Sequence, residues 1–305
     1  MKHHFADLLS REGNYWTIIP NDQRFFFSVA HEIEDKTLVK SLTISKQDEN
    51  WRQIFDCPNL EELTLSNPSQ EQVQEIGKLV QLKRLRLSFF RAADISFISS
   101  MHNLEELVFE YVSGFSDLGP LQRLPALRSL HLENLRRVSS FDGLKGIAEL
   151  QYLYISGTLD WNQPIADFSF LEGLPNLEYL GLGFVNCKAE FPVLSSALSL
   201  KKLKRLSVGI ATFHTKEYAF LNVALPHVIK GYVKDETCWR PYYYIDQNNI
   251  YFLGKGTRAM KPKASNAAAK KQAAVEQFEI YTREAEELLR NAWPALACPA
   301  GNAAN

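Results

Sequence analysis

Three ionisable side chains near the middle of the sequence are spaced so that they could share one site. His131 and Glu133 are two residues apart in a segment that alternates with leucines, and residues two apart lie on the same face of a β-strand. Glu110 holds the position of Glu133 in a similar segment that comes earlier. An imidazole near two carboxylates can hold a metal ion or transfer a proton. These residues raise the hypothesis of an enzyme or a metal site.

A second group is aromatic. Tyr152 and Tyr154 alternate with apolar residues in one segment, and Tyr179 holds the position of Tyr152 in the next, close to Gly181 and Gly183. We predict that the three rings are exposed beside a shallow depression that the glycines leave open. Exposed tyrosines of this kind are typical of the energetic centre of a protein interface. Replacing all three by Ala is expected to weaken partner binding and to leave thermal stability nearly unchanged.

Both groups depend on strands that recur along the chain. The pattern L-x-x-L-x-L, with apolar replacements, begins at residues 39, 60, 82, 104, 127, 150, 177 and 203. Its last two apolar residues lie on one face of a short strand, which cannot bury them alone. Stacking the strands in a parallel sheet pools them into one continuous core. The pattern therefore predicts an α/β solenoid.

At this spacing the chain resembles the leucine-rich-repeat family, whose units span about 20–29 residues. It is most similar to the short repeats of internalins and of a phosphatase-regulatory subunit, over about residues 36–210. The segments that return to the next strand carry this likeness: Asp94–Ile98, Asp117–Leu121, Phe141–Leu144 and Asp167–Leu171. The resemblance implies a curved parallel sheet, a turn and short helix after each strand, and an adaptor, regulatory, toxin-neutralising or effector role.

The chain departs from this family at one position. The usual Asn after each strand is replaced at residues 68, 90, 112, 135, 158, 185 and 211. We therefore expect the turns to satisfy their backbone polar groups in another way.

The ends of a solenoid need caps, because they expose core residues. We predict an N-terminal cap over residues 1–36, built with Trp16 and Phe25–Phe27, and a solenoid over 37–225. A C-terminal cap over 226–293 would consist of a hairpin, with strands at 242–245 and 250–253, and a helix from about Ser265 to Asn291. Residues 294–305 are predicted to be a flexible tail.

The residues that alternate with the core leucines define the predicted binding face. Arg84 lies between Glu62 and Glu106 on neighbouring strands, which favours a structural ladder of ion pairs. The predicted partner-binding residues are the three tyrosines as anchors, with orientation and selectivity set by Arg86, Glu106, Glu110, His131 and Glu133.

Composition excludes several classes of function. The formal net charge of −1 argues against a nucleic-acid partner, and the chain has no stretch of 18 apolar residues that would enter a membrane. The first residues do not read as a secretory signal, so we expect a cytoplasmic protein, although signal-less export as an effector fits as well. The four cysteines form no C-x-x-C pair, which argues against a zinc ribbon or a disulfide scaffold.

The sequence thus predicts a non-catalytic module that binds another protein, without a cofactor or a metal. The alternative is an enzyme that uses a site near His131 and Glu133 or in the C-terminal module. We rank it second because an open sheet offers no evident pocket that excludes water.

Overall fold

The computed structural model describes residues 11–12, 15–16, 27–230, 236–246 and 248–294, which belong to two compact units. The solenoid unit comprises Met1–Lys188 and Ser199–Leu203. The C-terminal unit comprises Ala189–Leu198 and Lys204–Asn305. The predicted N-terminal cap lies largely outside the described residues.

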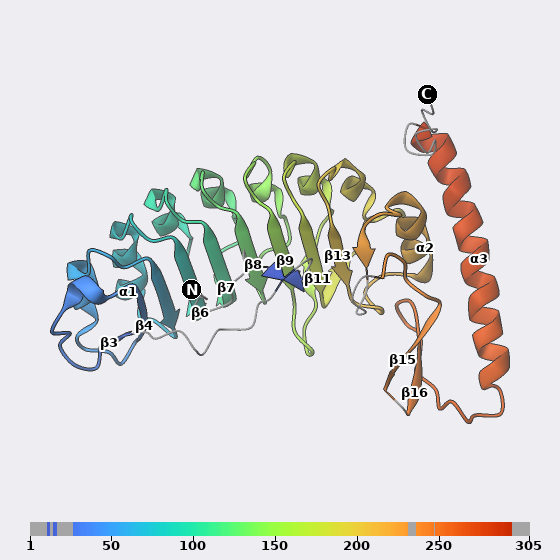
Figure 1. Cartoon of the computed structure of the whole chain (residues 1–305), viewed down its shortest axis with the longest axis horizontal. Helices are drawn as coiled ribbons and strands as arrows, with labels where there is room; N and C mark the ends of the chain where they lie inside the picture. Colours follow the sequence, from blue (N-terminus) through green and yellow to red (C-terminus); the bar gives the residue numbers. More distant parts are fainter. Residues whose placement is uncertain (1–10, 13–14, 17–26, 231–235, 247, 295–305) are drawn as a thin grey trace. The chain divides into compact units, whose positions relative to one another are not determined.

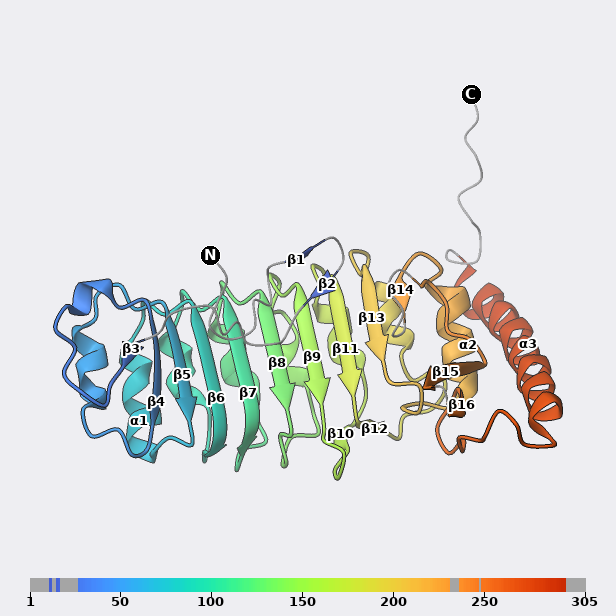
Figure 2. The same cartoon turned by 60° about the horizontal axis from the view of Figure 1, so that its bottom comes forward.

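Parallel strands in chain order form the sheet of the solenoid unit (Figures 1 and 2). Equivalent repeat positions pair in register, as for Leu63 with Leu85 and Leu85 with Leu107. The predicted solenoid with a parallel sheet is confirmed. The strands are β3 (Phe27–Ser28), β4 (Ser41–Ser45), β5 (Glu62–Ser66), β6 (Arg84–Arg91), β7 (Glu106–Ser113), β8 (Ser129–Glu133), β9 (Tyr152–Ser156) and β11 (Tyr179–Gly183).

The core consists of the apolar residues of the repeat. The side chains at the fourth and sixth positions of each unit, such as Leu85 and Leu87 on β6, are fully buried. Because the pairing is in register, each leucine lies beside the equivalent residue of the next strand. The opposite face of the sheet, which we call the non-core face, carries the residues that alternate with them.

Short helices follow the strands, as the family resemblance implies, and most are 3-10 helices. Asp94, Asp117 and Asp167 accept hydrogen bonds from backbone N–H groups two residues on, which fixes the turn before three of these helices. In the solenoid unit the helices are η1 (Lys36–Leu38), η2 (Trp51–Asp56), α1 (Gln70–Glu75), η3 (Ile76–Lys78), η4 (Ser96–Ser100), η5 (Gly119–Arg123), η6 (Asp142–Leu144) and η7 (Ser169–Gly173). All but the last residue of η8 (Ser195–Ser199) belongs to the C-terminal unit.

Two kinds of hydrogen bond replace those of the missing Asn at the strand ends. The first is a backbone bond to the next strand: the N–H of Asn67 donates to the carbonyl of Ser88 at 2.9 Å, and the N–H of Asn134 to that of Ser156 at 2.8 Å. The second is the buried Gln163 amide, which donates to the carbonyl of Val138 and accepts from the N–H of Leu135. The expectation that the turns satisfy their polar groups in another way is confirmed.

Four further strands form small separate pairs in the solenoid unit. The strands β10 (Gln163–Ile165) and β12 (Val185–Cys187) are parallel. The strands β1 (Arg11–Glu12) and β2 (Tyr15–Trp16) are antiparallel.

The C-terminal unit contains the predicted hairpin and helix. The strands β15 (Tyr242–Asp246) and β16 (Asn249–Phe252) pair antiparallel, and α3 spans Ala267–Ala292. Two short strands, β13 (Arg205–Val208) and β14 (Ile229–Lys230), pair in parallel. No helix within the described ranges is long and apolar enough to cross a membrane.

Sequence periodicity does not reveal α2 (Thr215–Ala224), which packs against α3. Its residues from Glu217 to Leu221 are all buried, so it shows no apolar stripe. The Glu217 carboxylate accepts hydrogen bonds from the N–H groups of Val193 and Leu194, and burial raises its pKa above the ordinary value.

Candidate functional site

The first residues of β5, β6 and β7 on the non-core face form a buried ion-pair ladder. Arg84 Nε donates to Glu106 Oε1 at 2.8 Å, and Arg84 Nη1 donates to Glu62 Oε1 at 3.2 Å. Both glutamates are fully buried, and Arg84 is largely buried. Glu106 was predicted to meet a partner, but its carboxylate is enclosed and bound to Arg84, so we leave it out of the candidate site.

Further along the same strands, a second group of charges is more accessible. Arg86 donates from Nε and Nη2 to Oε2 of Glu110, at 3.0 and 2.7 Å. Glu110 on β7 is directly opposite Glu133 on β8, and all three side chains are partly exposed. Like charges in directly opposed positions repel, and the Arg86 guanidinium reduces that cost at Glu110.

His131 lies beside this group and is only 3% exposed. Its Nε2 is 3.7 Å from Oε2 of Glu133, which is too long for a hydrogen bond, and its ring stacks on Tyr154 at 4.6 Å. Within the described ranges, neither ring nitrogen has a hydrogen-bond partner. The predicted proximity of His131, Glu133 and Glu110 is present: donor atoms of the three lie within 4.8 Å of one another.

The expectation that all three tyrosines are exposed is wrong. Tyr152 is 1% exposed and Tyr179 is 9% exposed, and their rings stack at 4.6 Å with an angle of 13° between the planes. Burial, and then the nearby Tyr179 and Tyr154, raise the pKa of Tyr152 well above its ordinary value. Tyr154 alone of the three stays partly exposed.

The predicted depression above the glycines is occupied by the ring of Tyr154. A Cβ atom at Gly181 would lie 2.4 Å from Cδ2 of Tyr154, and one at Gly183 would lie 2.7 Å from the Tyr154 hydroxyl oxygen. These glycines are therefore needed because the ring approaches the backbone closely. They provide space for a side chain of this protein, and not an empty subsite.

Two exposed aromatic residues were missed by the sequence reasoning. Phe89 and Tyr111 directly follow the polar ends of the β6 and β7 repeats, are 59% and 39% exposed, and stack with ring centroids 5.0 Å apart. Both have positive φ, 57° and 55°. The only signal in the sequence was that aromatic residues recur at this repeat position, which Phe184 also holds, just outside the apolar–polar alternation.

We call this accessible region, which lies beyond the first residues of β6 to β9, the strand-end patch. Its members share partial or full exposure and lie on neighbouring strands of one sheet. They are Arg86, Phe89, Glu110, Tyr111, Glu133 and Tyr154.

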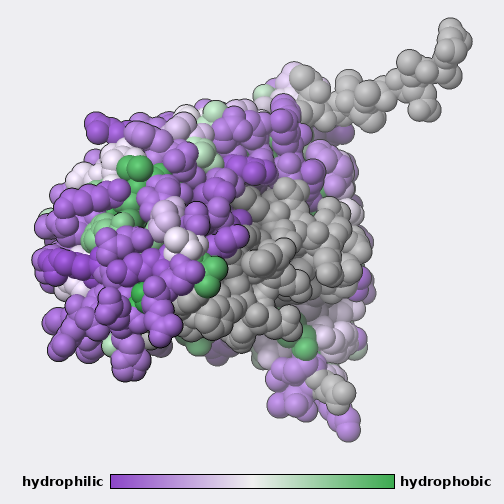
Figure 3. Space-filling model, turned by 60° about the vertical axis from the view of Figure 1, so that its left-hand side comes forward, coloured by the Kyte–Doolittle hydropathy of each residue, from purple (hydrophilic) through white to green (hydrophobic). Residues whose placement is uncertain are grey.

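The surface at the β3 and β4 end of the solenoid unit has a different character. Its described part is mostly hydrophilic, with small separate apolar areas (Figure 3). For the described residues of this side, recognition through a broad apolar surface is therefore not favoured.

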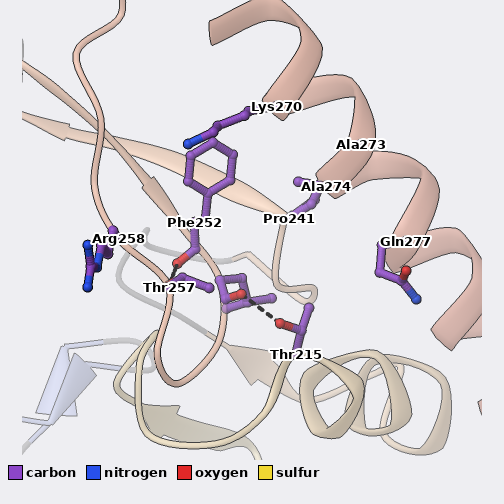
Figure 4. Close-up of a pocket in the computed structure, with 10 residues that line it drawn as sticks. Thr215, Pro241, Phe252, Thr257, Arg258, Lys270, Ala273, Ala274 and Gln277 are labelled. Atoms are coloured by element: carbon purple, nitrogen blue, oxygen red, sulfur yellow. Dashed lines mark hydrogen bonds between the residues drawn. The ribbon is translucent and has the colours of Figure 1, made fainter. Parts of the chain in front are cut away.

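The C-terminal unit has a cavity of about 350 Å³ between the hairpin and α3, lined in part by Pro241, Phe252 and Ala274 (Figure 4). Two hydroxyl groups also line it. Thr215 donates to the carbonyl of Leu253, and Thr257 donates to the carbonyls of Phe252 and Gly254. Both hydroxyls are thus bound to the backbone, which does not favour a nucleophilic role for either.

No protein-family model and no curated protein matches this sequence. Among solved structures, an internalin of Listeria monocytogenes has 21% identity and a TM-score of 0.39, and the match covers 57% of this chain and 55% of that one. A leucine-rich-repeat protein of Leptospira interrogans has 18% identity and a TM-score of 0.45, with 65% and 49% covered. A chain of the mouse RP105/MD-1 complex has 18% identity and a TM-score of 0.40, with 60% and 33% covered.

This chain therefore spans less than two thirds of each of these structures. The leucine-rich-repeat fold of the solenoid unit is established by its own repeats, its in-register parallel strands and its 3-10 turns. The predicted resemblance to this family in fold is confirmed.

Proposed function

We propose that the chain is a non-catalytic recognition module that binds another protein through the strand-end patch. The observation that carries the proposal is the exposed, stacked pair of Phe89 and Tyr111. Tyr111 directly follows Glu110 on β7, Glu110 binds Arg86, and Glu133 lies opposite Glu110 on β8. Aromatic anchors with a charged surround are the composition of an interface hot spot.

Backbone geometry does not account for aromatic residues at these two positions. The left-handed conformation recurs at the same place in other repeats, where Asn67, Asn134 and, outside the patch, Phe184 occupy it. Asn suits this conformation, whereas a bulky side chain is strained in it. Phe89 and Tyr111 are also exposed, so they contribute little to the core. A binding role explains the aromatic side chains that neither the turn nor the core requires.

The charges of the patch indicate the chemistry of the partner. Two carboxylates, Glu110 and Glu133, accompany one guanidinium, Arg86. In the chain without a bound cation, a partner with a Lys or Arg side chain beside an apolar group would complement both the charge and the rings. The patch extends over about three strand spacings, about 14 Å, so the adjoining loops would complete an interface of standard size.

The test is an affinity measurement on a double variant, Phe89→Ala with Tyr111→Ala. A pull-down with the wild-type chain first provides the partner, whose affinity is then measured by calorimetry. We expect the double variant to lose about 2 kcal/mol of binding free energy, about 30-fold in Kd. Its thermal midpoint should change little, because both side chains are exposed.

Phe184→Ala is the matched control. Phe184 is an exposed phenylalanine with positive φ at the same turn position, but it follows β11, outside the patch. We expect it to bind the partner as the wild type does. Equal losses in both variants, or no loss in the double variant, would contradict the proposed location of the site.

The alternative from the sequence, an enzyme, is favoured by one observation: the buried His131 close to Glu133. Neither the cavity of the C-terminal unit nor the cavity beside η4, near Phe97 and His102, is lined by these residues. We therefore keep catalysis as the second candidate. Turnover in an activity screen that is lost in the His131→Gln variant would favour catalysis over recognition.

A further inference from the structure

We propose that Glu110, His131 and Glu133 hold one divalent metal ion, zinc, on the non-core face between β7 and β8. This differs from our sequence-based expectation of no metal. It does not rest on the proposed recognition of a partner, because the ion would bind to the chain alone.

The geometry brings three suitable donor atoms together. His131 and Glu133 lie two residues apart on β8, and Glu110 lies opposite Glu133 on β7. Their donor atoms are within 4.8 Å of one another. Zinc bonds of about 2.0–2.2 Å place tetrahedral ligand atoms about 3.4 Å apart. Small rotations of the two glutamate side chains, which are both partly exposed, would close the remaining gap.

The state of His131 is the independent observation that points to a ligand. The imidazole is 3% exposed, and within the described part of the chain both ring nitrogens lack a hydrogen-bond partner. Buried polar atoms are normally hydrogen-bonded, and an unsatisfied one needs an explanation. Its Nε2 is directed toward Glu133, at 3.7 Å from Oε2. A metal ion between the two would satisfy this nitrogen.

Charge supports the same assignment. Glu110 and Glu133 face each other across adjacent strands, which is unfavourable for two carboxylates. Arg86 binds Glu110, whereas the ion pair of Glu133 among the described residues is the long one with His131. A divalent cation would compensate the remaining negative charge.

The donor set favours zinc over other common ions. Zinc accepts both imidazole nitrogens and carboxylate oxygens as ligands, while calcium and magnesium prefer oxygen ligands alone. Three protein ligands leave the fourth position of a tetrahedral ion to water. Tyr154, stacked on the imidazole with 11° between the planes, fixes the orientation of that ring.

The experiment is a calorimetric titration of the metal-stripped full chain with Zn²⁺. The wild type is compared with His131→Gln, Glu133→Gln and the control His102→Gln, which changes an exposed histidine of the same unit. We expect the wild type and the control to bind equally. His131→Gln should weaken zinc binding by more than about 100-fold. Replacing a residue that only hydrogen-bonds to a metal ligand weakens binding by up to about 100-fold, and the loss of a ligand itself should exceed that. Zn²⁺ should raise the thermal midpoint of the wild type and the control, but not of His131→Gln.

Glu133→Gln keeps the proposal testable if the buried His131 cannot be replaced without unfolding, since Glu133 is partly exposed. Absence of Zn²⁺ binding by the wild type would overturn the proposal. So would equal affinity in the wild type and both ligand variants, which would place the ion elsewhere, for example at His3 and His4 outside the described residues. Equally tight binding of Ca²⁺ or Mg²⁺ would overturn the assignment to zinc. None of these results depends on a partner, so they are distinct from failure of the strand-end patch.

Discussion

The non-core face has two halves, and the residues at the start of the strands are buried by different interactions in each half. On β5 to β7 the first positions are Glu62, Arg84 and Glu106, held together by ion pairs. On β9 and β11 they are Tyr152 and Tyr179, held together by ring stacking. In both halves these residues are largely or fully enclosed. The comparison shows that the start of these strands is a packed layer in its own right, while Arg86, Glu110, Glu133 and Tyr154, further along the strands, are partly exposed.

The ion pairs of one half and the stacked rings of the other stabilise the fold by different energetic contributions. A buried ion pair gains Coulomb energy but loses the hydration of its charges, so its net contribution depends on every partner being present. Stacked rings gain mainly by removing apolar surface from water, with a further contribution from their mutual orientation. The free energy of unfolding should therefore fall most when side-chain volume is removed from the aromatic half, and when a charge is removed from the charged half.

The largest effect is expected in the aromatic half. Tyr152→Ala removes a ring that is 1% exposed and stacked on Tyr179, and it leaves a cavity. We expect a loss of about 3–5 kcal/mol in the free energy of unfolding, measured by urea denaturation. This is the opposite of the sequence-based expectation that the tyrosines can be removed without loss of stability.

Tyr154→Ala is the comparison within the same half. Its ring is partly exposed, so less apolar surface returns to water when it is removed. We expect a clearly smaller loss of stability than for Tyr152→Ala. Equal losses would mean that burial does not separate the two tyrosines.

The next effect is expected in the charged half. Arg84→Met removes the cation that binds two fully buried carboxylates, Glu62 and Glu106, while keeping much of the side-chain volume. We expect a loss of about 3 kcal/mol in the free energy of unfolding, the lower end for breaking a buried pair, because Arg84 is slightly exposed.

Lys83→Met is the control for this prediction. Lys83 precedes Arg84 in the chain and forms an ion pair with Glu61 at 2.9 Å. Both side chains of this pair are well exposed. Exposed pairs contribute about 0–1 kcal/mol. If Arg84→Met costs no more than Lys83→Met, the ladder does not stabilise the charged half.

Sequence periodicity was sufficient for the strands because their leucines recur at a spacing that only a stacked sheet can bury. It also indicated which side chains face one another, as for Arg84 between two glutamates. It did not predict α2, because consecutive residues from Glu217 to Leu221 are buried and no apolar stripe marks the helix. A helix enclosed on all sides carries no amphipathic signal.

Exposure on the non-core face could not be predicted in the same way. The pattern places Tyr152, Tyr154 and Tyr179 on one face, but their burial depends on how the rings pack against one another and over Gly181. Phe89 and Tyr111 were missed because their left-handed turn position lies outside the alternation. Both errors concern side-chain packing, which a one-dimensional pattern does not contain.

The smallest effect is a pH dependence that also separates the halves. An unfolded tyrosine loses its proton near pH 10, whereas burial, with Tyr179 and Tyr154 nearby, raises the pKa of Tyr152 in the folded chain. The folded state therefore retains more protons above pH 10, and stability falls as pH rises. Relative to Tyr152→Phe, the wild type should lose about 1 kcal/mol between pH 10 and 11.

The measurement is urea denaturation of the wild type and Tyr152→Phe at both pH values. Only the difference between the two proteins is used, because the other titrating groups are common to both and cancel. A difference that does not change with pH would mean that the Tyr152 hydroxyl is open to water, and the contrast between an enclosed aromatic half and an ion-paired half would then be lost.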